Sequence, residues 1–171
     1  MRDLKALIRE IPDFPKPGIL FKDITTLLRD AGAFDEAMRR VTDLARPLAP
    51  QQVVCVESRG FLVGAPVARD LGAGVIPIRK PGKLPGAILR EEYALEYGTD
   101  ALEMHEGAIA PGQRVLVVDD VLATGGTASA AARLIARAGG VLAGYVFLIE
   151  LSALGGRARL GAAPAHALIT Y

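Results

Sequence analysis

Two adjacent carboxylates, Asp119 and Asp120, stand between an apolar run and a turn made of small residues. Gly125 and Gly126 in that turn let the backbone approach a ligand without interference from a Cβ atom. The alanine-rich segment that follows predicts a helix, whose first free N–H groups would point toward the same space. Because such amides bind anions, the turn is a candidate phosphate site.

The hydroxyl groups of Thr124 and Thr127 can add donors to these amides, so a phosphate monoester could be held without a lysine. The segment lacks the GKS or GKT sequence of a P-loop, and no GxGxxG fingerprint follows a predicted strand. These features argue against a Walker-type nucleotide site and against a dinucleotide-binding fold.

The acid pair can accept hydrogen bonds from two neighbouring hydroxyl groups, such as a ribose 2′,3′-diol, and would repel a second phosphate. In the alternative interpretation, Asp119 and Asp120 only cap the strand end or the following helix. The pair alone does not decide between these roles. In either role, we expect both side chains at an exposed sheet edge.

The elements around this turn predict an α/β fold with an open, mainly parallel twisted sheet flanked by helices. The runs QVVCVE, GVIPIR and RVLVVDD lack polar alternation, as expected for strands covered on both faces, and FLVGAPVARDLG and TASAAARLIARAG show helical spacing. Residues 33–46 predict another helix. VLAGYVFLIEL and HALITY add two strands, whereas ILREEYALEYG and DALEMHE predict antiparallel strands beside the core.

Two further segments frame the predicted core. Residues 2–11 show helical spacing before a proline-rich turn, and residues 79–87, RKPGKLPGA, predict a flexible basic loop. The apolar side chains between residues 12 and 22 are suited either to core burial or to contact with a flat aromatic ligand.

Composition narrows the class of protein. The 171 residues are 51% apolar, which is enough for one domain with a sizeable core. Because 20 basic residues nearly balance 19 acidic ones, we expect no nucleic-acid or membrane partner. We expect no signal peptide or membrane span, and a cytoplasmic location. Cys55 is expected to be a buried hydrophobe, and His105 and His166 lack partners at metal-ligand spacing.

Residues 115–127, VLVVDDVLATGGT, resemble the signature of the type I phosphoribosyltransferases, which bind 5-phospho-α-D-ribose 1-diphosphate (PRPP). The resemblance implies one domain over residues 1–171, with a hood over about residues 1–32 and a core over about 33–171. It implies that Asp119 and Asp120 hold the ribose hydroxyl groups. The residues implied to wrap the 5′-phosphate are Ala123, Thr124, Gly125, Gly126 and Thr127.

FPKPGILFKDIT, ESRGF, IRKPGKLPG and ALEYG are similar to segments of the adenine phosphoribosyltransferases. The similarity implies a glycosyltransferase of purine salvage that makes AMP and diphosphate from adenine and PRPP. Main-chain groups of Leu20 and Lys22 would read adenine, while Phe21 and Val121 sandwich its ring. The family often has arginine at the position of Lys22, and a main-chain contact should tolerate the difference.

The diphosphate is implied to bind at ESRGF, through Ser58 and Arg59, where relatives often have a cis peptide at the position of Glu57 and Ser58. The basic loop would contribute Arg79, Lys80 and Lys83. On local grounds, Arg59 could instead cap carbonyl groups and the loop cations could be solvated charges. The resemblance also implies Mg²⁺ carried by PRPP, with no direct protein ligand assigned.

The ALEYG segment is implied to supply Glu96, which would orient adenine or relay a proton, and Tyr97, which would cover the site. Without the resemblance, Glu96 would be a solvent-facing strand residue. The catalytic set implied by the family is therefore Glu96, Arg59, Asp119 and Asp120. The family also implies a homodimer.

Two rival functions remain open. A transferase for hypoxanthine, guanine or xanthine would keep the sugar-phosphate site and change the base pocket, but such relatives place a lysine close after the signature, and none follows here in TASAAARLIARAGG or VLAGYVFLIEL. A non-catalytic PRPP-sensing regulator would need an additional binding surface, and the sequence contains no helix-turn-helix extension.

Overall fold

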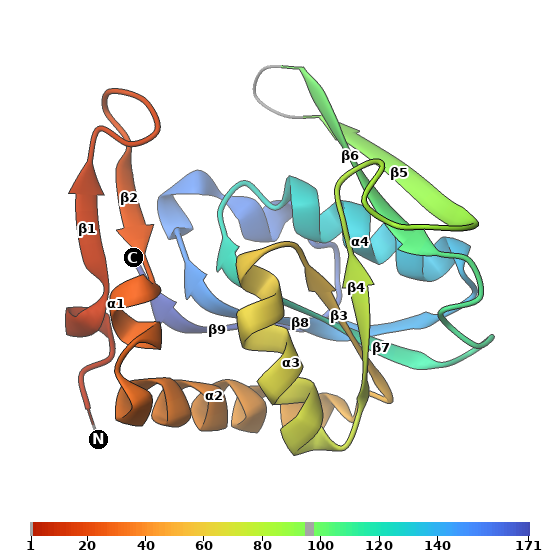
Figure 1. The fold of residues 1–171 in the computed structure, drawn as a ribbon, viewed down its shortest axis with the longest axis horizontal. Helices are drawn as coiled ribbons and strands as arrows, with labels where there is room; N and C mark the ends of the chain where they lie inside the picture. The colour runs from red at the N-terminus through yellow and green to blue at the C-terminus, as the bar shows by residue number, and fades with distance from the viewer. Residues whose placement is uncertain (1, 95–97) are drawn as a thin grey trace.

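Five parallel strands form the central sheet of the computed structural model, which describes residues 2–94 and 98–171 (Figure 1). Their spatial order is β4-β3-β7-β8-β9, so the predicted open parallel sheet is confirmed. The strands span Gln52–Val56 (β3), Gly74–Ile78 (β4), Arg114–Leu122 (β7), Val141–Glu150 (β8) and Ala165–Thr170 (β9).

Successive residues of the central strands enter different hydrophobic clusters. In β3, Val53 and Cys55 belong to one cluster, and Val54 and Val56 belong to the cluster on the opposite face. All four side chains are buried. Burial on both faces explains why the sequence of this strand shows no polar alternation.

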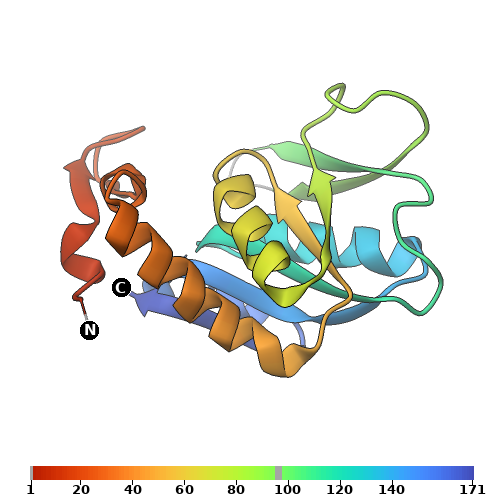
Figure 2. The same cartoon turned by 60° about the horizontal axis from the view of Figure 1, so that its bottom comes forward.

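Helices cover both faces of the sheet, as predicted (Figure 2). Helices α2 (Ala31–Ala45) and α3 (Arg59–Leu71) pack in one cluster, whereas α4 (Gly126–Arg137) packs in the other. Asp30 caps α2 by accepting a hydrogen bond from Ala33 N at 2.9 Å. Gly72 ends α3 in the left-handed region, with φ of 69°.

The direction in which strands are added reverses between β3 and β7. From β3 the chain crosses through α3 to β4, and β7, β8 and β9 extend the sheet on the other side of β3. Open parallel sheets bind ligands outside the carboxyl ends of their strands at such a switch point. The fold therefore brings residues 57–59 and 119–127 to the same edge.

The N-terminal segment differs from its prediction. Residues 2–11 do not form one helix: a 3₁₀ turn, Lys5–Leu7, is followed by β1 (Arg9–Pro12), which pairs antiparallel with β2 (Leu20–Asp23). Leu4 and Ile8 are still buried, so their spacing reflected core contacts. Pro12 disfavours a helical conformation at the residue before it. Pairing with β2 gives hydrogen-bond partners to the main-chain groups of the extended segment.

Strands β5 (Ile88–Ala94) and β6 (Thr99–His105) form the predicted antiparallel pair, an arm that lies beside α4 (Figure 1). Backbone hydrogen bonds of 2.9 and 2.7 Å between Arg79 and Glu103 tie β6 to the start of the basic loop. Four short elements were not predicted: α1 (Thr25–Leu28) and the 3₁₀ turns Arg46–Leu48, Ser152–Leu154 and Gly156–Arg159.

Two further expectations concern burial and hydropathy. Cys55 is fully buried, as predicted, and burial followed by the charge of Asp119 raises the pKa of its thiol to about 12. The thiol therefore stays protonated and is a poor nucleophile. Within the described ranges, the structure has no helix with the length and apolar character that a membrane crossing requires.

A side chain at Gly64 of α3 would collide with β3. An added Cβ would lie 2.1 Å from Cys55 Sγ and 3.1 Å from Cys55 Cβ. We expect Gly64→Ala to lower the free energy of unfolding by about 1–3 kcal/mol through overpacking, measured as a lower Tm in thermal denaturation. Combining it with Cys55→Ala should recover part of the loss. A Tm for Gly64→Ala equal to that of the wild type would contradict this packing.

Candidate active site

The acid pair lies inside β7 and is buried, whereas the sequence predicted an exposed sheet edge. Asp119 and Asp120 are 9% and 6% exposed, and Asp119 pairs with Phe147 of β8. The prediction failed because β7 continues to Leu122, so neighbouring strands and α3 cover the two carboxylates. Gly60 of α3 allows this approach, since a Cβ there would lie 2.5 Å from Asp119 Oδ1.

The two carboxylates have different partners. Asp120 N donates to Asp119 Oδ1 at 2.9 Å, and Arg59 Nε donates to Asp120 Oδ2. Burial, and then the charge of Asp120, raises the pKa of Asp119 well above its usual value. Arg59 therefore compensates the negative charge of Asp120, whereas the charge of Asp119 is poorly compensated.

The glycine turn after β7 forms a small cavity of about 80 Å³ at the start of α4. Gly125 has φ of 80°, a left-handed conformation that glycine adopts without strain, and Gly126 begins the helix. In the described part of the chain, no main-chain hydrogen bond engages the N–H groups of Gly126, Thr127 and Ala128, so these groups can bind an anion. The cavity is lined by Asp119, Val121, Leu122, Ala123, Thr124, Gly125, Gly126, Thr127 and Ala128.

A larger cavity of about 400 Å³ adjoins this turn and brings most of the predicted site residues together. The predicted residues that line it are Leu20, Phe21, Lys22, Arg59, Lys80, Asp119, Asp120, Val121, Ala123 and Thr127. Three residues predicted to bind the diphosphate do not line this cavity: Ser58, Arg79 and Lys83. Ser58 and Arg79 are next in sequence to the lining residues Glu57 and Lys80, and Lys83 forms an ion pair with Glu57. The two cavities share four lining residues: Asp119, Val121, Ala123 and Thr127.

Aromatic and aliphatic side chains form part of the wall of the larger cavity. Phe21 packs edge-on against Phe14, with ring centroids 5.1 Å apart, and the Arg59 guanidinium carbon lies 5.3 Å from the Phe21 ring centroid. Leu151 and Leu154 also line this cavity, which the sequence did not indicate. Such walls suit a flat heterocycle.

Leu20 and Lys22 lie two residues apart in β2, so their main-chain groups point to the same edge of that strand. Among the described residues, β2 pairs only with β1. The ammonium group of Lys22 pairs with Glu10 and lies 4.0 Å from the Tyr171 ring centroid. Its side chain is therefore engaged elsewhere, which leaves the predicted main-chain role untouched.

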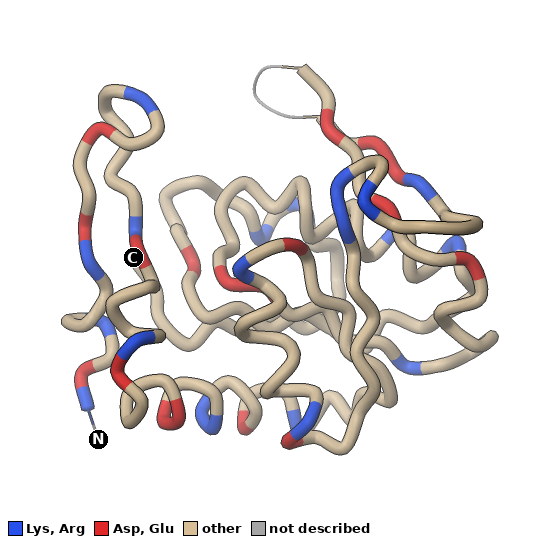
Figure 3. Tube along the Cα trace, in the orientation of Figure 1, with Lys and Arg blue, Asp and Glu red and all other residues tan. Residues whose placement is uncertain are grey.

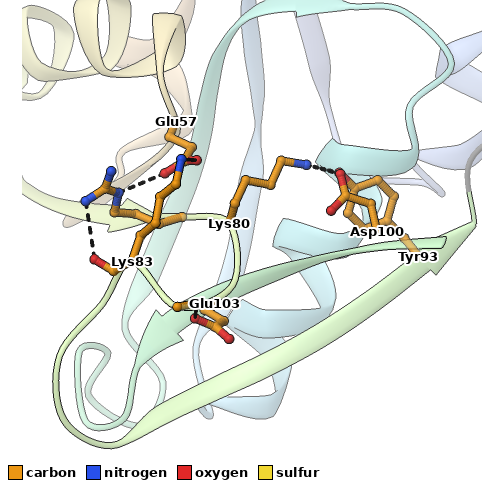
Figure 4. A network of polar contacts seen from close by, with 8 residues as sticks. Glu57, Lys80, Lys83, Tyr93, Asp100 and Glu103 are labelled. Atoms are coloured by element: carbon orange, nitrogen blue, oxygen red, sulfur yellow. Dashed lines mark hydrogen bonds and ion pairs between the residues drawn. The ribbon is translucent and has the colours of Figure 1, made fainter.

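Carboxylates hold all three cations of the basic loop in this structure (Figure 4). Arg79 Nε donates to Glu57 Oε2 at 2.8 Å, and Lys83 Nζ donates to Glu57 Oε1 at 2.7 Å. Burial opposes ionisation of Glu57, but the hydrogen bonds from Lys83 and Arg79 outweigh it and lower the pKa of this carboxyl. The Glu57–Ser58 peptide is cis, as the resemblance implies.

Lys80 points the other way, into a network that the sequence did not reveal (Figure 4). Its ammonium pairs with Asp100 and donates to Tyr93 Oη at 2.8 Å. Thr127 Oγ1 donates to the same hydroxyl at 3.4 Å. Tyr93 and Asp100 were predicted only as strand residues, because a pair seven apart along a hairpin carries no sequence signal before the register is known.

Two predicted residues, Glu96 and Tyr97, lie outside the described residues, so their roles stay predictions. The described residues include no set of three carboxylate, histidine or cysteine side chains able to hold a metal by themselves. Glu57, Asp119 and Asp120 nevertheless give the larger cavity carboxylate oxygens, the donors that Mg²⁺ prefers. These donors fit a magnesium ion that takes its other ligands from a phosphate substrate and water.

The raised pKa of Asp119 has a consequence for stability. The folded chain keeps a proton on this carboxyl at pH values at which the unfolded chain has lost it. Stability therefore falls as pH rises from about 4, the ordinary range of an aspartate, through the raised pKa.

We expect Asp119→Asn to raise Tm at neutral pH, because the amide oxygen can accept the hydrogen bond from Asp120 N without a buried charge. A gain of about 1 kcal/mol corresponds to roughly 2–4 °C for a chain of this size. The gain should shrink toward pH 4 in thermal denaturation series. Asp35→Asn, at an exposed site of α2, serves as the control. A larger gain at pH 4 than at pH 8 would contradict the assignment.

Comparisons with known proteins agree with this geometry. The model of the phosphoribosyl transferase domain family matches residues 34–158. A Synechococcus adenine phosphoribosyltransferase is 57% identical over 169 residues, covering 99% of both chains.

Solved structures give the same result. The enzyme of that name from Thermoanaerobacter pseudethanolicus superposes with a TM-score of 0.97 at 49% identity, covering 99% of this chain and 98% of the other. The Saccharomyces cerevisiae enzyme, solved with adenine and an imino-altritol bisphosphate, gives 0.91 at 39% identity, covering 95% and 94%. With its sheet, acid pair and glycine turn, the chain belongs to the adenine phosphoribosyltransferase family.

Proposed function

We propose that the chain transfers the 5-phosphoribosyl group of PRPP to adenine, giving AMP and diphosphate, in purine salvage. One observation carries the proposal: a cavity of about 400 Å³ joins the acid pair to aromatic and aliphatic walls and to three cationic residues, Lys22, Arg59 and Lys80. Its size and mixed lining are those of a small-molecule site.

In this proposal, Asp119 and Asp120 accept hydrogen bonds from the 2′ and 3′ hydroxyl groups of ribose. The N–H groups and hydroxyls of residues 123–127 hold the 5′-phosphate. The lining residues shared by the two cavities support this division, because they show that the cavity at the phosphate turn adjoins the one that contains the acid pair.

The reaction breaks the bond between C1′ and the diphosphate oxygen, which leaves with both electrons. N9 of adenine forms the new bond to C1′ on the opposite face and gives up a proton. We propose that Ser58, Arg59, Arg79, Lys80 and Lys83 bind the diphosphate. Each of these cations now pairs with a carboxylate, so the diphosphate would replace Asp120, Glu57 and Asp100 as their partner.

Mg²⁺ would enter on PRPP and neutralise charge at the diphosphate oxygens, with no direct protein ligand assigned, although Glu57, Asp119 and Asp120 line the same cavity. As the leaving group departs, the ribose gains positive character. The poorly compensated carboxylate of Asp119 is then stabilised more strongly than in the free protein, so its benefit is greatest in the transition state.

Adenine is the base that the site favours. Phe21 and Val121 line the cavity where the ring would be sandwiched, and main-chain groups of Leu20 and Lys22 would read its edge. Residues 127–151 contain no lysine to meet a 6-oxo group. Glu96 remains our proposed residue for orienting adenine or relaying its proton, and Tyr97 our proposed cover for the site.

The location, oligomeric state and domain division of the chain are also part of the proposal. We infer a cytoplasmic homodimer, with residues 1–32 as a hood over a core of residues 33–171. Charges of both signs are interspersed along the chain (Figure 3), which favours an enzyme of small molecules over a regulator that binds nucleic acid.

Turnover assays with PRPP, Mg²⁺ and each of adenine, hypoxanthine, guanine and xanthine test the proposal. We expect diphosphate release that depends on both substrates, with kcat/KM for adenine at least about 100-fold above the other bases, because a 6-oxo purine leaves hydrogen-bonding groups unpaired. Faster turnover with hypoxanthine would contradict the base assignment. Folded protein that binds PRPP but releases no diphosphate with any base would favour the regulator.

A further inference from the structure

A half-buried ion pair outside the cavity, between Arg157 and Glu150, holds the segment that follows β8. Glu150, the last residue of β8, has a side chain only 8% exposed. Arg157 Nε donates to Glu150 Oε1 at 2.6 Å, and Arg157 Nη2 donates to Oε2 at 2.7 Å. This bidentate geometry fixes the guanidinium plane as well as its position.

Arg157 also reaches the neighbouring strand. Its Nη1 donates to the main-chain carbonyl of Ala165, the first residue of β9, at 2.7 Å. The guanidinium thus binds the carboxyl end of β8 and the start of β9 together, with residues 151–160 looped around it. Within this loop, residues 152–154 and 156–159 form 3₁₀ turns.

The first part of this loop forms a wall of the larger cavity. Leu151 N donates to Leu122 O at 2.9 Å, which joins the loop to the end of β7. Leu151 and Leu154 both line this cavity, as Phe21 does. Leu154 is 51% exposed, so packing beneath the loop does little to fix this residue.

The second part of the loop supports the phosphate turn. A Cβ at Gly125 would lie 2.3 Å from Gly156 O, and a Cβ at Gly156 would lie 2.2 Å from Ala123 O. The two backbones therefore touch directly, and Figure 1 shows the segment after β8 beside the turn that leads into α4. A shift of Gly156 must move residues 123–125 or open a gap behind them.

We propose that Arg157 is a positioning residue that sets the base wall and the phosphate turn at once, through the loop that it holds on Glu150 and Ala165. The proposal rests on the proposed function, because it assigns adenine to the wall and the 5′-phosphate to the turn. Arg157 lines neither of the two cavities. It acts through Leu154 on one side and through Gly156 on the other.

The test compares Arg157→Met with variants that disturb one contact each. Arg157→Met removes all three hydrogen bonds of the guanidinium and should raise KM for both adenine and PRPP by about tenfold, with a smaller change in kcat. Leu154→Ala should raise KM for adenine alone. Gly156→Ala, which presses on Ala123 O, should raise KM for PRPP alone.

Arg114→Met is the matched control, because Arg114 also donates to main-chain carbonyls, those of Ala49 and Leu48, at the opposite end of β7. It should lower Tm without raising either KM. Equal KM values in Arg157→Met and Arg114→Met, or a rise for only one substrate in Arg157→Met, would overturn the proposal. If Arg157→Met does not fold, Arg157→Lys, which keeps the charge and loses the bidentate geometry, is judged by the same criteria.

Calorimetry separates this inference from the proposed function. Adenine and ribose 5-phosphate are titrated separately into the wild type, Arg157→Met and Arg114→Met. If the wild type binds both ligands but forms no AMP, the proposed transferase activity fails, whereas weaker binding of both ligands by Arg157→Met alone still supports the positioning role. Unchanged binding of either ligand by Arg157→Met overturns it.

Discussion

Burial of Asp119 beside Asp120 at the carboxyl end of β7 is the constraint on which the rest of the site depends. Two adjacent carboxylates in a region that solvent barely reaches destabilise the free protein, as the raised pKa of Asp119 records. Arg59 compensates one of them, and Gly60 allows α3 to come close enough for that contact. In our proposal, a ribose diol and then a cationic transition state supply the remaining compensation.

The cations of the site are also paired within the free protein, and a ligand would replace their partners. Arg59, Arg79, Lys80 and Lys83 are each held by a carboxylate of the protein, so the free site is nearly neutral although it is rich in charge. A diphosphate would exchange these partners for its own oxygens. Because these cations already lie at the cavity or beside it, the protein does not have to bring cationic side chains from elsewhere when the diphosphate binds.

Local pattern and tertiary contact explain what could and could not be predicted from the sequence. The β-branched runs predicted the sheet because strands buried on both faces need such residues, and Gly125 and Gly126 marked a turn where backbone must approach a ligand. The helix predicted for residues 2–11 was wrong because strand pairing with β2 outweighed the helical spacing of the apolar residues. Asp119 and Asp120 proved buried because the length of β7 depends on its neighbours. Leu154, Gly156 and Arg157 carry no motif, and only the folded chain brings them to the cavity and the turn.

The direct test of the account is whether the acid pair recognises a ribose diol. Isothermal titration calorimetry would compare AMP with 2′-deoxy-AMP, which lacks one of the two hydroxyl groups. We predict that the wild type binds AMP about tenfold or more tightly, as expected when a hydrogen bond to a charged acceptor is lost. The preference should disappear in the Asp119→Asn/Asp120→Asn double variant. Equal affinities of the wild type for the two nucleotides would contradict the central role assigned to Asp119 and Asp120.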